Sequence, residues 1–242
     1  MFDTDGINTT YTYLPRHLKA KGYAAHHIGK WHNGFYEYDM TPPGRGFDSS
    51  LGFLTGGEDH WTSTIGMPCA GGTVDLSYGW SSNRSVVPAV GLNGTYTGHT
   101  FSNRAVQLIR DHERSAPLFL YIALHNTHAP VESPPEYAGL YNYSQQKENE
   151  YLGQVTFVDH TVANITAALR ETELWANTLF VSLPEEALLS TLSSLLSSVL
   201  RRSGPRTTAR RSTRPVPTTR SAEARARCGT AATVCPASLA VG

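Results

Sequence analysis

The 242-residue sequence has few cysteines, no long apolar run and no net charge at pH 7. It has three cysteines, Cys69, Cys228 and Cys235. An odd number of widely spaced cysteines does not form a disulfide framework, which excludes the small disulfide-stabilised folds. No stretch approaches the length and apolarity of a membrane-spanning helix, so we expect no membrane span. The first ten residues, MFDTDGINTT, lack the apolar core of a signal peptide.

The absence of net charge hides an uneven distribution. Residues 201–242 carry nine Arg, one Glu and no Lys, a net charge of +8, whereas residues 1–200 carry 11 basic and 19 acidic groups, a net charge of −8. An acidic body is not typical of a nucleic-acid-binding protein. Blocks of like charge are more often disordered than folded, so the basic tail does not change this interpretation. We therefore expect no nucleic-acid partner.

Composition divides the chain into three parts. Residues 1–182 have the patterned apolar segments of a globular domain, which we interpret as part of a catalytic domain. Residues 183–202 form an apolar stripe, with Ser182 and Glu185 spaced as a capping box, which predicts an amphipathic helix. Residues 203–242 contain no aromatic side chain and predict a disordered tail. The abrupt change after Ser182 suggests translation out of frame or through an intron, which transcript reads across that codon would test.

Five N-x-[ST] sequons favour a secreted or lumenal protein, of a lysosome-like or secretory compartment, because the motif is the acceptor for N-linked glycans. None has Pro at its middle position. The candidate glycosylation sites are Asn8, Asn83, Asn93, Asn142 and Asn164. Since a lumenal protein requires a signal peptide and none is visible, we expect that Met1 is not the natural start.

Helical and strand patterns alternate through the first 182 residues, which predicts an α/β fold. Residues 118–124 are a continuous apolar run, typical of a strand buried on both faces of a sheet. The other predicted strands lie at 23–28, 46–53, 73–78 and 177–182, and the predicted helices at 11–21, 100–113 and 144–172. Thr100 is expected to cap the second helix. The expected inner side of the third consists of Leu152, Val155, Val158, Val162 and Ile165.

Residues 22–32, GYAAHHIGKWH, combine a strand pattern with polar side chains where the strand ends. Gly29 lets the backbone turn, so that Lys30 and His32 follow at the edge of the sheet. Ligands bind at that edge in open α/β sheets. Lys30 suits an oxyanion, and His32 can exchange a proton with a reacting oxygen. On composition alone, a surface lysine beside a packed histidine is the alternative.

Three segments together resemble the sulfatases. Residues 22–32 are similar to the second signature of that family. TPPGRGFDSSLGF at 41–53 resembles the Arg-Gly-Phe-Asp turn of arylsulfatase-B-like members, and PLFLYIALHNTHAPV at 117–131 resembles their later strand and His-Pro loop. The resemblance spans residues 13–181, an internal part of the family's N-terminal domain. Ala25 departs from it, because the family usually has Ser or Thr there.

The resemblance implies an alkaline-phosphatase-like α/β fold, with a mixed, mostly parallel sheet and helices on both faces, here incomplete. It also implies a sulfuric ester hydrolase. By the resemblance, Lys30 contacts the sulfate, His32 holds a hydrated formylglycine nucleophile, and His128 is a second sulfate ligand and the acid for the leaving group. The implied substrate is a sulfated small molecule or glycan, and the implied cofactor of the full-length protein is Ca²⁺.

Several parts of the family's site have no counterpart in the 242 residues. Formylglycine arises from a Cys in a C-x-P-x-R segment, and none of the three cysteines lies in one. Asp3 and Asp5 do not match the calcium-binding Asp pair, and Ser182 stands where an Asp-Asn pair is expected. The lysine expected beyond that pair is missing, since no Lys follows Lys147. A divalent cation needs several converging oxygen ligands, so we predict no metal site in this chain and a truncated, inactive enzyme.

The remaining polar residues of these motifs are interpreted as structural. His26 and His27 are adjacent on a strand and point to opposite faces, so at most one can join a site, and we favour a structural role for both. His125 begins the histidine loop and is a candidate to support the site from behind. Arg45 and Asp48 are expected to pin their turn rather than to touch substrate.

Two other functions stay open from the sequence. The same fold supports hydrolysis of phosphoesters and phosphonate esters, and without a nucleophile the sequence does not separate these from sulfate esters. The missing nucleophile also favours a secreted, non-catalytic protein that binds sulfate or glycans through Lys30 and His128. The low-complexity tail disfavours that reading, because a selected binding protein should end in a coherent element. An upstream C-x-P-x-R exon and a downstream D-N-G-G frame would favour the enzyme.

Overall fold

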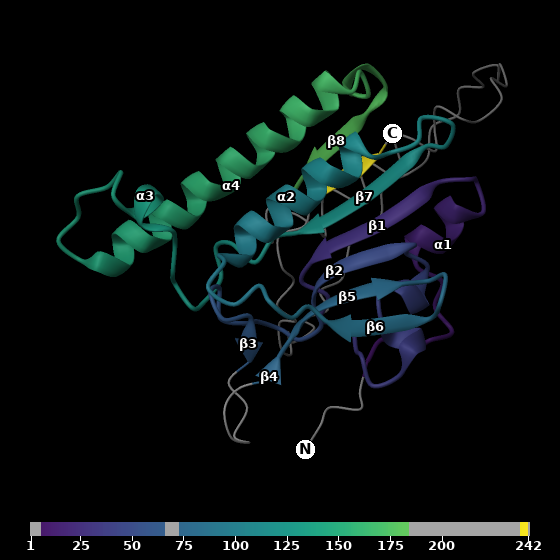
Figure 1. The fold of residues 1–242 in the computed structure, drawn as a ribbon, viewed down its shortest axis with the longest axis horizontal. Coiled ribbons are helices and arrows are strands. Elements are labelled where there is room, and N and C mark those ends of the chain that lie inside the picture. The colour runs from purple at the N-terminus through teal and green to yellow at the C-terminus, as the bar shows by residue number, and fades with distance from the viewer. Residues whose placement is uncertain (1–5, 66–72, 184–237, 242) are drawn as a thin grey trace, which may run out of the picture. The chain divides into compact units, whose positions relative to one another are not determined.

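The computed structural model describes residues 6–65, 73–183 and 238–241. Its main feature is a seven-stranded sheet with the order β6-β5-β2-β1-β7-β9-β8 (Figure 1). The strands are β1 (Ala24–Gly29), β2 (Ser49–Phe53), β5 (Leu76–Trp80), β6 (Ser85–Pro88), β7 (Leu118–Ala123), β8 (Leu179–Ser182) and β9 (Ser238–Val241), with β3 (Thr64–Ile65) and β4 (Thr73–Val74) forming a separate pair. The α-helices are α1 (Leu14–Lys19), α2 (Thr97–Arg110), α3 (Pro135–Ala138) and α4 (Gln146–Glu171), and the short 3₁₀ helices are η1 (Tyr38–Met40), η2 (Pro43–Arg45) and η3 (Trp175–Asn177).

The sheet is mixed, as expected, but the expectation that it is mostly parallel is wrong. Only the pairings of β1 with β2 and of β1 with β7 are parallel, whereas the other four pairings among these strands are antiparallel. Parallel strands need a crossover connection. The four residues between β5 and β6 are too few for a crossover, so these two strands lie antiparallel. At the other side, β9 lies antiparallel to both β7 and β8, so β7 and β8 still point in the same direction.

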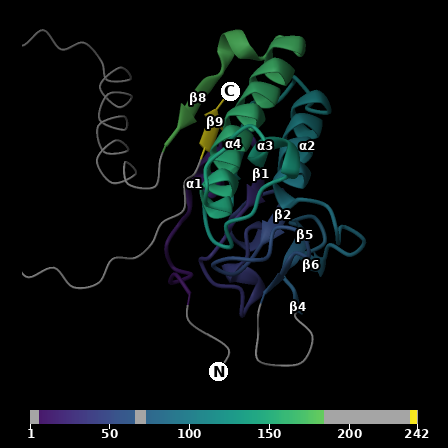
Figure 2. The same ribbon diagram turned by 90° about the vertical axis from the view of Figure 1, so that its left-hand side faces the viewer.

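The strand β7 is buried on both faces, which explains its continuous apolar sequence. Leu120 and Ile122 pack in the core group that α2 and α4 cover, whereas Phe119 points to the opposite face. On that opposite face it joins Trp31 and Phe47, against which α1 packs through Leu18. Helices therefore cover both faces of the sheet, as expected (Figure 2).

Two details of the long helices differ from expectation. The helix α2 begins at Thr97, so Thr100 lies inside the first turn and does not cap it. In α4, Val155 is 38% exposed, while Phe157 and Thr161 are buried. Ile165 is buried and Val158 packs against the core as expected, but the apolar pattern missed polar side chains of the inner face, among them Gln154, which donates to a neighbouring loop.

The turn at 41–53 is pinned as expected. The Arg45 guanidinium donates to the backbone carbonyl oxygens of Ile7 and Asn8. The Asp48 carboxylate accepts from the backbone N–H of Ala25 at 2.9 Å and from the Lys19 ammonium at 2.5 Å. These contacts fix the turn to α1 and β1, and neither side chain is free for substrate.

The prediction that residues 203–242 are disordered does not hold for Ser238–Val241, which form β9 within the sheet. The predicted helix at 183–202 and most of the tail lie outside the described residues. In the part of the chain that the structure covers, no helix has both the length and the apolar character of a membrane span.

Candidate active site

Three loops leave the same edge of the sheet, because β1, β2 and β7 are parallel neighbours. The carboxyl ends of parallel strands gather at one edge, where ligands bind in this class of fold. The loop that begins at residue 30 carries Lys30 and His32, and the loop that begins at residue 124 carries His128. The three candidate site residues therefore follow neighbouring strands at one edge of the sheet.

Lys30 is held at the end of β1 by the backbone. Its N–H donates to the carbonyl oxygen of Ala123 at 2.9 Å. Gly29 makes this approach possible: its φ is +95°, and a Cβ atom there would lie 1.9 Å from that same oxygen. The Lys30 side chain is only 5% exposed, and among the residues described no carboxylate lies within ion-pairing distance of its ammonium.

His32 and His128 approach consecutive residues of the loop after β2. A Cβ atom on Gly56 would lie 2.8 Å from Cε1 of His32, and one on Gly57 would lie 3.6 Å from Cε1 of His128. Loop residues 54 and 55 are fixed in turn by Asp75, whose carboxylate accepts from both backbone N–H groups at 3.1 Å. The two imidazole rings thus face one short, anchored segment.

The tautomer of neutral His128 follows from its hydrogen bond. Its Nδ1 lies 2.7 Å from the carbonyl oxygen of Ala129, which can only accept, so Nδ1 carries the proton. That leaves Nε2 as the ring atom that takes up or releases a proton. His128 is partly exposed, in contrast to the histidines behind it.

Two buried histidines stack behind His128. The ring centroids of His125 and His128 are 5.5 Å apart, and those of His60 and His125 are 4.2 Å apart. Burial is the main cause that lowers the pKa of His60 to about 4 and that of His125 to about 2. The nearby His128 and Lys30 also lower the pKa of His125. Both buried rings are therefore neutral at pH 7.

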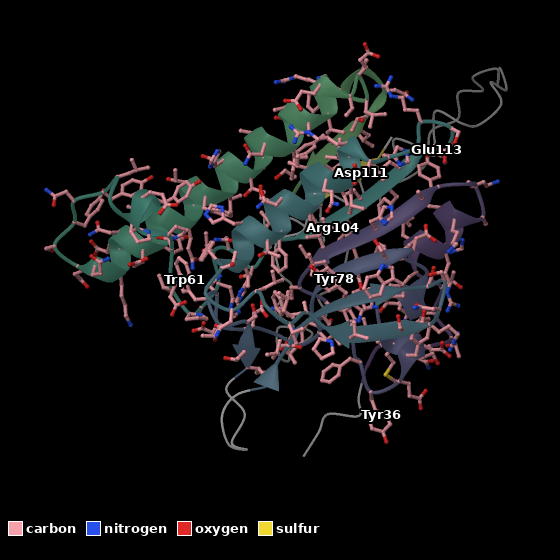
Figure 3. All side chains as sticks on the ribbon, viewed as in Figure 1. Tyr36, Trp61, Tyr78, Arg104, Asp111 and Glu113 are labelled. Carbon is pink, nitrogen blue, oxygen red and sulfur yellow. The ribbon has the colours of Figure 1, made fainter. Side chains whose placement is uncertain are left out.

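The sequence did not point to His60, Glu58 or Gln154. Gln154, on α4, donates to the carbonyl oxygens of Glu132 at 2.8 Å and Pro130 at 3.3 Å, which holds the His128 loop. The only available signal was the polar run Glu58-Asp59-His60 after the buried strand β2. Trp61 packs against the aromatic cluster of Tyr96, Tyr137 and Phe157. Figure 3 shows Trp61 near the start of α2, whereas Asp111 lies at the other end of that helix.

His26 and His27 have the structural positions that we favoured. Nδ1 of His26 lies 2.8 Å from Oγ of Ser49 on the neighbouring strand. His27 is 1% exposed, and its ring packs edge-on against Trp31 at 5.3 Å and stacked on Tyr121 at 5.6 Å. His27 also contacts the end of β1, because its Nε2 lies 3.2 Å from the backbone carbonyl oxygen of Lys30.

The comparisons with known proteins identify the family. The sequence profile of the Sulfatase family matches residues 2–183. The chain belongs to the Sulfatase family. It is 31% identical to mouse arylsulfatase J over 169 residues, which cover 69% of this chain and 27% of the relative. It is 26% identical to the arylsulfatase of Klebsiella aerogenes over 137 residues, 55% of this chain and 27% of the relative. The chain thus spans about a quarter of the length of these curated relatives.

Solved structures share the sulfatase fold. The structure of Ps i-CgsB in complex with k-i-k-neocarrahexaose superposes with a TM-score of 0.62 at 21% identity, over 74% of this chain and 41% of that one. The PsFucS1 sulfatase from Pseudoalteromonas sp. superposes with a TM-score of 0.56 at 18% identity, over 73% of this chain and 38% of that one. The predicted alkaline-phosphatase-like fold is confirmed.

Sulfatases in general use a divalent metal, but the residues present here do not fit one. Within residues 6–65 and 73–183, no three His, Cys, Asp or Glu side chains are grouped so that they could hold a metal ion. The strand β8 ends at Ser182, followed by Leu183, so neither carboxylate nor amide oxygen follows it directly. We therefore derive no chemical step from a metal in this chain.

Proposed function

We propose that the full-length protein is a sulfuric ester hydrolase of the arylsulfatase type, and that the 242 residues supply the side of its site that binds the sulfate group. The proposed substrate is a sulfated small molecule or glycan. Lys30 is the proposed sulfate ligand, with His128 as second ligand and acid for the leaving oxygen, and His32 is the proposed contact to the nucleophile. The nucleophile itself and the Ca²⁺ ligands are proposed to belong to parts of the protein that these residues lack.

The observation that carries this proposal is that Lys30 is 5% exposed and has no carboxylate within ion-pairing distance in the described part of the chain. A buried cation with no carboxylate beside it is unfavourable, unless an anion binds there. Because His60 and His125 are neutral, the charge of the group at pH 7 comes from Lys30 alone when His128 is also neutral. A sulfate monoester carries a single negative charge, which matches this single positive charge. A phosphate monoester is mainly a dianion at that pH and would need a second cation.

His128 is placed to serve a leaving group. Its Nδ1–H is anchored on the carbonyl oxygen of Ala129, so the ring keeps its orientation as Nε2 gains and loses a proton. A protonated Nε2 can donate to an alkoxide oxygen that leaves from sulfur.

The proposed location of the full-length protein is lumenal or extracellular, as a glycoprotein. All five sequon asparagines are exposed, although Nδ2 of Asn164 lies 3.5 Å from Oγ of the buried Ser102, so the other four are the better glycan acceptors. Asn164 lies on α4, and the other four lie in loops.

The chain is expected to bind an aryl sulfate weakly and not to hydrolyse it. Binding of nitrophenyl sulfate at pH 7.5 would be followed by calorimetry, and release of nitrophenolate by absorbance, with and without added Ca²⁺. Nitrophenyl phosphate is the matched control and should bind more weakly, because its second charge is not compensated. Calcium-dependent turnover, or tighter binding of the phosphate, would contradict the proposal.

A further inference from the structure

Tyr96 has a buried hydroxyl group that joins the two ends of the His128 loop. The side chain is 1% exposed, and the residue lies immediately before α2. Its hydroxyl donates to the carbonyl oxygen of Glu132 at 3.0 Å, since a carbonyl oxygen can only accept. The same hydroxyl accepts from Nδ2 of Asn126 at 2.7 Å. Asn126 precedes His128 in the chain and Glu132 follows it, so one hydroxyl group closes the loop from both sides.

The two ends of the loop differ in how much they depend on Tyr96. The carbonyl oxygen of Glu132 also accepts from Gln154 at 2.8 Å, so that end is held twice. The Asn126 side chain is 2% exposed, and within the described residues its Oδ1 has no partner, which leaves the bond to Tyr96 as its one side-chain hydrogen bond there. Burial raises the pKa of Tyr96, so the hydroxyl keeps the proton that it donates.

The Tyr96 ring stands at the end of a row of four rings that reaches His128. Its centroid lies 5.1 Å from that of His60, in a stacked arrangement. The row continues from His60 to His125 at 4.2 Å and from there to His128 at 5.5 Å. The backbone N–H of Thr97 donates to the carbonyl oxygen of His60 at 2.8 Å, which ties the start of α2 to this row. Phe in place of Tyr96 would keep the ring in the row and remove only the hydroxyl.

We propose that Tyr96 is a positioning residue for His128. Its hydroxyl holds the Asn126 end of the loop, and this keeps the carbonyl oxygen of Ala129 where it accepts from Nδ1 of His128. The ring then presents Nε2 to the leaving oxygen. This inference rests on the proposed function, because it takes His128 to be the acid for the leaving group. Tyr96 acts through the loop alone and is not a contact of the substrate.

Tyr96→Phe tests the hydroxyl by itself. Nitrogen NMR spectra of the neutral His128 ring report which ring nitrogen carries the proton. The wild type should show the proton on Nδ1, as the hydrogen bond to Ala129 requires, whereas Tyr96→Phe should show both tautomers in exchange. The affinity for nitrophenyl sulfate, measured by calorimetry, should fall about fivefold in the variant, the value of one hydrogen bond.

Tyr137→Phe is the matched control. Tyr137 belongs to the same aromatic cluster as Tyr96, but its hydroxyl pairs with Nδ1 of His160 on α4 and not with the His128 loop. This variant should keep the wild-type tautomer of His128 and the wild-type affinity for nitrophenyl sulfate. Mixed tautomers in Tyr137→Phe would show that any lost hydroxyl in the cluster has the same effect, which overturns the role of Tyr96.

A double variant separates positioning from stability. Tyr96→Phe leaves Nδ2 of Asn126 buried without a partner, which destabilises the fold, whereas replacing both partners by apolar groups removes most of that penalty. Tyr96→Phe combined with Asn126→Leu should therefore regain stability against urea without regaining the single tautomer of His128. A single tautomer in either variant overturns the role of Tyr96. Absence of nitrophenyl sulfate binding by the wild type overturns the proposed function, and the tautomers, which need no ligand, still decide the role of Tyr96.

Discussion

Replacing Lys30 with Met is expected to lower the affinity for sulfate about 100-fold, since removing one partner of a buried, charged contact costs roughly 2–5 kcal/mol. The Met side chain keeps the length of the apolar stem, so the packing at the end of β1 is preserved. Lys30 is anchored through its backbone N–H to Ala123, and this bond does not depend on the side chain. The loss should therefore appear in binding, with little change in the fold.

Thermal unfolding in sodium sulfate measures this loss. Sulfate stabilises most proteins by exclusion from their surface, so the Lys30→Met variant supplies the baseline for that general effect. The wild type should show an additional rise in unfolding temperature that saturates with sulfate, as specific binding requires. Lys21→Met, at an exposed turn, is the matched control and should behave like the wild type. A variant at Lys30 that follows the wild-type curve would mean that sulfate binds elsewhere.

The second large effect is loss of stability in acid. Burial lowers the pKa of His27 and His60 to about 4 and that of His125 to about 2, below the ordinary value of 6.5. For a group with a lowered pKa in the folded state, the stabilisation is present above pH 6.5 and is lost as the pH falls through the folded-state pKa. Each of these groups should remove roughly 3 kcal/mol between pH 6.5 and 4. Together they approach the total stability of a typical domain.

His27→Phe isolates one of these contributions. The His27 ring already lies among aromatic side chains, so Phe suits the packing, and it removes the contact of Nε2 with the backbone carbonyl oxygen of Lys30 at 3.2 Å. Urea unfolding at a series of pH values should show about one proton fewer taken up on unfolding near pH 5. His17→Phe, at an exposed position of α1, should leave the pH dependence unchanged. Equal pH dependence in wild type and His27→Phe would show that His27 is not held neutral.

The sequence predicted those candidate site residues that directly follow a buried strand. The apolar runs before Lys30 and before His128 predict neighbouring parallel strands, and the geometry of such strands brings both residues to one edge. The structure confirms this arrangement through the pairing of β1 with β7.

Other parts were not predictable from local patterns. The antiparallel pairings of β2 with β5 and of β5 with β6 follow from no period in the sequence. Glu58 and His60 reach the site because β2 pairs with β1, which only the tertiary structure shows. The inner face of α4 was predicted only in part, because the pattern of apolar residues does not reveal the buried polar residues Gln154 and Thr161. Nothing in the tail's composition suggested that residues 238–241 would pair in the sheet.

A crystal structure of this chain with phenyl sulfate tests the central claim most directly. We predict that the sulfate group lies between the Lys30 ammonium and Nε2 of His128, with its oxygens at about 3 Å from both nitrogen atoms. The phenyl ring should extend past His128 toward Ala129 and Pro130. A sulfate group bound away from Lys30, or a Lys30 ammonium paired with a carboxylate while His128 points away, would contradict the assignment.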